Sequence, residues 1–220
     1  MKYSTAILIV FLIILADQAL KFYIKTHYYY QQDVNVIGHW FKLHFIENEG
    51  MAFGMTINHA QTGKVILTLF RLAAVIFGFY YVNVLVKKRY SRGTIICASL
   101  ILAGALGNLI DSMFYGLIFT ESTYPFHLVG GTVNFAAKLV PLGHGYGQFL
   151  HGKVVDMLYF PLFDMRWPKW IPFIGGNEFE FFAPVFNIAD ASISVGVFIL
   201  LLFQKRMVHK QVVHTIQENG

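Results

Sequence analysis

Long apolar runs alternate with mixed polar segments along this chain. Four runs stand out, at about residues 5–24, 65–86, 94–117 and 185–203. Each is close to the length of about 20 apolar residues that a helix needs to cross a bilayer. The pattern therefore predicts a mainly α membrane protein, in which four transmembrane helices form a single domain over residues 1–220. No small-residue cleavage site follows the first run, so we interpret it as an uncleaved span.

Basic residues set the expected orientation of these spans. The loop between the second and third runs, K-K-R-Y-S-R at 87–92, has four basic residues in six, and the carboxy-terminal tail begins K-R-M-V-H-K at 205–210. Because cytoplasmic loops carry an excess of lysine and arginine, we expect both segments and the amino terminus on the cytoplasmic side. Residues 25–64 and 118–184 then lie on the outer side.

The two outer segments differ from the spans in composition. Segment 25–64 contains the aromatic clusters Y-Y-Y and H-W-F and the alternating stretch F-K-L-H-F-I, which is typical of strands on a membrane surface. Segment 118–184 is rich in glycine, proline and aromatic residues. We therefore expect a small β-rich platform with inserted loops on the outer (periplasmic) face.

Composition agrees with a membrane protein. Of the 220 residues, 56% are hydrophobic and 13% are charged, and the mean hydropathy is +0.54. Soluble domains have about a quarter of their residues charged. The net charge of +5 comes from basic residues at the span ends, so it indicates topology and not nucleic-acid binding. The one cysteine, Cys97, excludes an intramolecular disulfide and a cysteine metal cluster.

The ionisable side chains inside the apolar runs all gather near one end of the predicted bundle. An ionisable group in a span costs roughly 3 kcal/mol on insertion scales, so its presence usually has a functional reason. In the expected topology every such residue lies near the outer membrane face. A functional site at that boundary explains the pattern better than scattered polar contacts do. The ionisable residues are Asp17, Lys21, Arg71, Asp111 and Asp190, and the amides Asn108 and Asn187 lie three residues before the last two.

Three carboxylates are available for chemistry at this face. Asp111 and Asp190 lie at the outer ends of their spans, and Asp156 lies in the short apolar stretch G-K-V-V-D-M-L-Y-F. Two carboxylates placed close together share one proton, and such a pair can activate a water and polarise a carbonyl. The serine-hydrolase pattern G-x-S-x-G and the zinc-protease pattern H-E-x-x-H are absent. Spacing alone identifies candidates and not a reaction.

Five stretches in order resemble the motifs of the lipoprotein signal peptidase (signal peptidase II) family, a family of four-span aspartic peptidases. Each stretch alone is a weak signal, whereas the five in sequence are highly specific. They are D-Q-A-L-K at 17–21, E-N-E-G-M-A-F-G at 47–54, G-A-L-G-N-L-I-D at 104–111, G-K-V-V-D-M at 152–157 and F-N-I-A-D-A-S-I at 186–193.

The resemblance implies an activity and a setting. Members of the family remove signal peptides from prolipoproteins by cutting before a diacylglyceryl-modified cysteine, with water activated by two aspartates and with no cofactor and no metal. The implied partners are these substrates and membrane lipid, with no nucleic acid. The resemblance also implies a monomer, inhibition by globomycin-type cyclic peptides, and a place in the bacterial inner membrane, with both termini cytoplasmic and the active site at the outer face.

The resemblance also implies residue roles. Asp156 and Asp190 are the expected catalytic pair. The expected pocket residues are Asn48, Gly50, Asn108, Asn187 and Ala189, and the expected structural supports are Asp17, Lys21, Asp111 and Gly104.

The chain departs from the family pattern at two places. Ser112 stands where the family usually has an arginine after the third-span aspartate, and either Arg71 or Arg166 could replace that guanidinium. The chain also has more residues between its motifs than the family usually has. We interpret about residues 118–150 and 160–182 as insertions on the outer face.

Three other functions have to be weighed. A proton-coupled transporter could use Asp111 and Asp190 as relay carboxylates, but internal repeats and paired broken helices are not evident in the sequence. A different intramembrane aspartic protease would carry a G-x-G-D motif, which is absent. A non-catalytic lipid-binding scaffold would tolerate replacement of the carboxylates.

Overall fold

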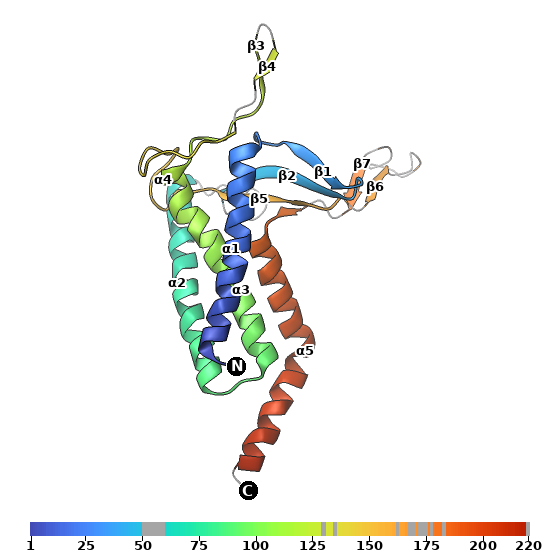
Figure 1. Ribbon diagram of the computed structural model, residues 1–220. Helices are drawn as coiled ribbons and strands as arrows, with labels where there is room; N and C mark the ends of the chain where they lie inside the picture. Colours follow the sequence, from blue (N-terminus) through green and yellow to red (C-terminus); the bar gives the residue numbers. More distant parts are fainter. Residues whose placement is uncertain are drawn as a thin grey trace.

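Long helices stand side by side and a layer of strands lies across one end of them (Figure 1). The computed structural model describes the chain except for residues 50–59, 129–130, 134–135, 162, 167–169, 171–175, 177, 182–183 and 219–220. The long helices are α1 (Tyr3–His27), α2 (Ala60–Lys87), α3 (Arg92–Ile110) and α5 (Ile188–Glu218). The predicted mainly helical fold is therefore confirmed.

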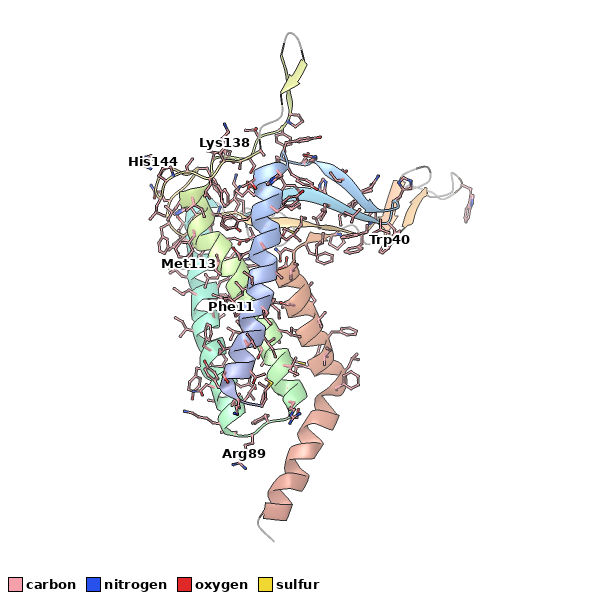
Figure 2. All side chains as sticks on the ribbon, viewed as in Figure 1. Phe11, Trp40, Arg89, Met113, Lys138 and His144 are labelled. Atoms are coloured by element: carbon pink, nitrogen blue, oxygen red, sulfur yellow. The ribbon has the colours of Figure 1, made fainter. Side chains whose placement is uncertain are left out.

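Three helical stretches are long and apolar enough to cross a membrane: Tyr3–His27, Thr62–Lys87 and Arg92–Ile118. The apolar part of α5, Ile188–Phe203, is shorter. Exposed apolar side chains such as Phe11, 58% exposed, lie along the helices, as lipid-facing surfaces require (Figure 2). The fourth predicted span stays a prediction. It was placed from Val185, whereas the helix begins three residues later, because Val185 pairs with Tyr159 in the sheet.

Helix α3 is the centre of the bundle and packs against α1, α2 and α5. Its closest neighbour is α5, and Gly104 makes that approach possible. A Cβ atom at Gly104 would lie 2.1 Å from the backbone oxygen of Ala189, so any larger residue would push the two helices apart. The first turn of α5, which carries Asp190, is thereby held against α3.

The predicted platform contains a four-stranded antiparallel sheet. Its strands are β1 (Asp33–Ile37), β2 (Phe41–Asn48), β5 (Val154–Tyr159) and β8 (Val185–Phe186), in the order β1-β2-β5-β8. Two separate hairpins join β3 (Phe126–Leu128) with β4 (Gly131–Val133), and β6 (Phe163–Arg166) with β7 (Glu178–Phe181). The alternating stretch seen in the sequence is β2.

The register of β2 and β5 decides what surrounds Asp156. Glu47 lies opposite Val155 and Asn48 lies opposite Val154, so Asp156 is opposite Ile46. An irregularity between Leu43 and Ile46 shifts the pairing upstream of this point. The other face of the junction is closed by an apolar cluster between sheet and helices, made by Ile24, Tyr28, Phe45, Tyr115, Phe119, Val155 and Met157.

The end of the third helix is bonded to the segment predicted as the first insertion. After Ile110 the helix widens into a π-turn, η2 (Asp111–Tyr115), and ends in the short α4 (Gly116–Ile118). Its backbone oxygens accept hydrogen bonds from returning residues: Gly152 N–H donates to Ser112 at 2.9 Å, and Gly147 N–H donates to Gly116 at 2.8 Å. Residues 138–152 therefore satisfy acceptors that a helix end otherwise leaves without partners.

Candidate active site

Residues from α1, α3, α5 and β5 meet where the helix bundle joins the sheet. The structure brings together seven of the residues singled out from the sequence, although up to 173 positions separate them along the chain. They are Asp17, Lys21, Asn108, Asp111, Asp156, Asn187 and Asp190.

The ammonium group of Lys21 lies at the base of this site and is fully buried. Its Nζ is 2.9 Å from Asp17 Oδ2, 2.8 Å from Asp111 Oδ2 and 3.0 Å from Asn108 Oδ1. A buried lysine without acceptors would be strongly unfavourable, and here three oxygens from two helices and a π-turn surround it. Asp17 and Lys21, both expected as structural supports, form an ion pair, and the structure adds Asp111 and Asn108 as partners of the lysine.

The two carboxylates around Lys21 also bind the segments that carry the other two aspartates. Asp17 Oδ1 accepts the backbone N–H of Ala189 at 2.9 Å, next to Asp190. Asp111 Oδ2 accepts the backbone N–H of Val155 at 3.3 Å, next to Asp156. The buried charge cluster therefore fixes the backbone on both sides of the candidate dyad.

Gln18 completes this cluster and was not singled out from the sequence, although it lies inside the quoted D-Q-A-L-K stretch. Its Nε2 donates to Asp111 Oδ1 at 2.8 Å, and its Oε1 accepts the hydroxyl of Tyr115 at 3.1 Å. The signal was its place one residue after Asp17. An amide can donate and accept at once, which lets it join a carboxylate to a phenol.

Asn187 has two functions that follow from its position before α5. Its Oδ1 accepts the backbone N–H of Asp190 at 2.8 Å, which is the hydrogen bond of a helix N-cap. Its Nδ2 donates to Asp156 Oδ1 at 2.7 Å. The same side chain thus ends the sheet-to-helix connection and ties one aspartate to the helix that carries the other.

Asn108 connects the buried lysine with Asp190. Its Oδ1 accepts from Lys21, and its Nδ2 donates to Asp190 Oδ1 at 2.7 Å. Because the lysine fixes which end of the amide is the oxygen, the N–H group must face the carboxylate. Asn187 Nδ2 lies 3.1 Å from the same Asn108 oxygen, so the two amides join Asp156 and Asp190 in one network.

The two candidate catalytic carboxyls differ in their surroundings. Asp156 is 3% exposed, whereas Asp190 is only partly buried at the first turn of α5. Burial, and next the negative charge of Asp190, raise the pKa of Asp156 from 3.8 to about 7. A pair of carboxyls in which one keeps its proton near neutral pH is the arrangement that acid–base hydrolysis needs.

The remaining predicted residues lie around this network or outside the described part of the chain. Asn48 Nδ2 is 3.5 Å from Asp156 Oδ2, and Arg71 Nη1 donates to Ser112 Oγ at 2.9 Å. Gly50 and the side chain of Arg166 lie outside the described residues. Among the residues described, no three histidine, cysteine, aspartate or glutamate side chains group as metal ligands, and the expected lack of a cofactor stays a prediction.

Comparison with known sequences gives a consistent result. A family model described as signal peptidase (SPase) II matches residues 9–205. The chain is 45% identical over 201 residues to the lipoprotein signal peptidase of Porphyromonas gingivalis, which covers 91% of this chain and 82% of that protein. It is 34% identical over 210 residues to the lipoprotein signal peptidase of Amoebophilus asiaticus, with 93% and 79% covered.

Two solved structures, both described as a bacterial membrane enzyme structure obtained by the in meso method, have a similar fold. One matches with a TM-score of 0.52 at 23% identity, covering 92% of this chain and 88% of the other. The second matches with a TM-score of 0.53 at 24% identity, covering 90% and 91%. At these identities the likeness shows the fold alone.

The raised pKa of Asp156 predicts a pH-dependent cost in stability. The folded state binds this proton more tightly than the unfolded state, so stability falls as pH rises from about 4 to about 7 and then levels off. Asp156→Asn removes the titrating group. In thermal melts in detergent from pH 4.5 to 8.5, the free energy of unfolding of the variant should therefore rise relative to that of the wild type by roughly 2–4 kcal/mol. Parallel melting curves at every pH would contradict the burial argument.

Proposed function

Because the chain belongs to the signal peptidase II family, we propose that its Asp156 and Asp190 form the catalytic dyad of a lipoprotein signal peptidase. The chain is a membrane protease, and the proposed reaction hydrolyses the peptide bond before a diacylglyceryl-modified cysteine. The observation that carries the proposal is the amide network in which Asn187 binds Asp156 and Asn108 binds Asp190. Family membership leaves the transporter alternative without support.

Asp156 is the proton donor in this proposal and Asp190 is the base. A water between them loses a proton to the Asp190 carboxylate while its oxygen attacks the scissile carbonyl carbon. Asp156 gives its proton to the carbonyl oxygen, which forms a neutral tetrahedral intermediate. The C–N bond then breaks, the proton held by Asp190 passes to the leaving amine, and a hydroxyl proton of the intermediate returns to Asp156.

The amide network supports this division of roles. Asp156 Oδ1 accepts a 2.7 Å hydrogen bond from Asn187, whereas among the described residues Oδ2 has the longer 3.5 Å contact with Asn48. We therefore assign the resting proton to Oδ2. Asp190 Oδ1 accepts from Asn108, whose amide is oriented by Lys21, so a hydrogen-bond donor faces this carboxyl in the proposed site.

Arg71 on α2 is the proposed replacement for the arginine that the family usually has at position 112. Its Nη1 donates to Ser112 Oγ, and Ser112 Oγ in turn donates to the backbone oxygen of Asn108 at 2.8 Å. Its positive charge interacts with Asp190, Asp111 and Asp156. A guanidinium that interacts electrostatically with both dyad carboxyls is suited to hold a substrate carbonyl and stabilise charge developing on its oxygen.

The membrane setting of the proposal follows from the ends of the bundle. The amino terminus lies at the end away from the sheet (Figure 1), and Arg89 of the basic α2–α3 loop lies at that same end (Figure 2). By the positive-inside rule that end is cytoplasmic, so the dyad works at the outer face of the bacterial inner membrane. The enzyme is proposed to act as a monomer, with the substrate's acyl chains in lipid, and to be inhibited by globomycin-type cyclic peptides.

The dyad is tested with a synthetic signal peptide that carries a diacylglyceryl cysteine. Asp156→Asn and Asp190→Asn should each lower turnover by roughly 10³-fold or more, since each removes a group that transfers a proton in the reaction. Asp33→Asn, at an exposed carboxylate of β1, is the matched control and should keep wild-type turnover. The unlipidated peptide should not be cut. Cleavage of the lipidated peptide at the wild-type rate by either variant, while folded, would contradict the proposal.

The role of Arg71 is tested by replacing it with a neutral residue and with another cation. Arg71→Gln should lower kcat/KM by roughly 10²-fold, as loss of an oxyanion donor does, and Arg71→Lys should recover part of that loss. Arg92→Gln, at an exposed arginine at the start of α3, is the control. Cleavage by Arg71→Gln at the wild-type rate would rule out this residue as the carbonyl-binding group.

A further inference from the structure

A second group of buried charges lies beside the sheet and is used by no step of the proposed reaction. It connects α1, β2, the segment predicted as an insertion and the residues that lead into β5. We call it the outer ion cluster. Its members are Lys25, Glu47, Ser122, Tyr146 and Lys153.

Lys25 and Glu47 are the centre of the outer ion cluster. Lys25 is fully buried and the Glu47 side chain is 3% exposed, and the two form an ion pair. Ser122 Oγ accepts from Lys25 at 3.0 Å and donates to the Glu47 carboxylate at 2.8 Å. A closed triangle of donor and acceptors in a buried place has its polar groups satisfied, so it holds its geometry firmly.

Tyr146 and Lys153 extend the cluster to the residues before Asp156. The Tyr146 ring lies under both ammonium groups, 5.1 Å from Lys25 Nζ and 5.3 Å from Lys153 Nζ. Its hydroxyl accepts the backbone N–H of Lys153 at 2.6 Å. Lys153 Nζ is 3.8 Å from the second Glu47 oxygen. The start of β5 is thereby fixed to β2 by side chains in addition to the strand pairing.

Two adjacent residues of β2 link the outer ion cluster with the catalytic side of the sheet: Glu47 belongs to the cluster and Asn48 contacts Asp156. Successive side chains of a strand point to opposite faces, so Glu47 faces the cluster when Asn48 faces Asp156. Glu47 lies opposite Val155 and Asn48 lies opposite Val154. Any slip of β2 along β5 would move Asn48 away from the Asp156 carboxyl.

We propose that the outer ion cluster positions Asp156 by holding Asn48 and the start of β5 in register, and that Ser122 and Tyr146, from the segment predicted as an insertion, contribute to this positioning. The inference rests on the proposed function, in which Asp156 is catalytic. Lys25, Glu47 and Ser122 are therefore positioning residues, which act on the reaction through the strand that carries Asp156.

The readout is the pH at which turnover declines on the alkaline side, because Asp156 must be protonated to act. Several groups from the packed elements face Asp156, and the hydrogen bond from Asn48 lowers its pKa. When that bond is lost, the pKa of Asp156 rises and activity extends to higher pH. The facing groups are Asp190 from α5 and Asn187 just before it, Lys21 from α1, Arg71 from α2, Asn48 from β2 and the neighbouring Asp111.

The experiment compares Lys25→Met and Glu47→Gln with the wild type in cleavage of the lipidated peptide from pH 5 to 9. Both variants should lower kcat by about tenfold with little change in KM, since a small misplacement of a catalytic group has effects of this size or larger. Both should move the alkaline limb upward. If the two charges acted on Asp156 directly, the alkaline limb would instead move to higher pH in Lys25→Met, which removes a cation, and to lower pH in Glu47→Gln, which removes an anion. Lys138→Met, at an exposed lysine of the same segment, should behave as wild type.

A double variant shows whether Asn48 carries the effect. Asn48→Ala should move the limb upward by itself, and Glu47→Gln/Asn48→Ala should move it no further, because both changes remove the same contact. If the charge variants fail to fold, Ser122→Ala decides, since it keeps both charges and removes only the bridging hydroxyl.

Two failures are distinguishable. The proposed function is overturned if the wild type does not cleave the lipidated peptide, or if the Asp156→Asn variant does. If wild-type activity depends on Asp156 but the folded cluster variants keep wild-type kcat and pH dependence with only lower melting temperatures, the cluster is purely structural and the further inference is wrong.

Discussion

The buried ammonium group of Lys21 is the interaction on which the rest of the site depends. It holds the carboxylates of Asp17 and Asp111 at 2.9 and 2.8 Å, and each carboxylate then accepts a backbone N–H next to a catalytic candidate. One cation thus organises the start of α5 and the middle of β5. Because the surrounding groups are buried, the hydrogen bonds are strong and the cost of leaving any of them unmade is high.

The sheet and the helix ends are arranged so that these contacts can form. Gly104 lets α3 and α5 approach closely, and the π-turn at Asp111 directs its carboxylate to Lys21 and to β5. Residues 138–152 then bond to the widened helix end. Such π-turns occur often at functional sites. The segment that the sequence marked as an insertion is therefore part of the support of the site.

Helices and candidate residues could be predicted from the sequence to different degrees. The apolar runs predict the helices because a helix that crosses lipid needs a long stretch of apolar side chains. The ordered motifs identified Asp156 and Asp190 as candidates. The tertiary partners of Lys25 and Lys21 could not be predicted, because packing brings Glu47 and Ser122 to the first and Asp111 to the second. Val185 lies at the end of an apolar run that suits a helix, but pairing with β5 makes it a strand residue. Gln18 was missed although it follows Asp17, because adjacent helix residues do not share a face and its contacts with Asp111 and Tyr115 come from tertiary packing.

The most direct test of this account is the melting temperature and peptide cleavage of Lys21→Met, measured beside Lys21→Met/Asp111→Asn. Removing one partner of a buried charge group costs roughly 3–5 kcal/mol, because the carboxylates left behind lose their counter-charge. We expect a loss of this size with loss of cleavage in the single variant, and partial recovery of stability in the double variant. A single variant that melts and cleaves as the wild type does would contradict it.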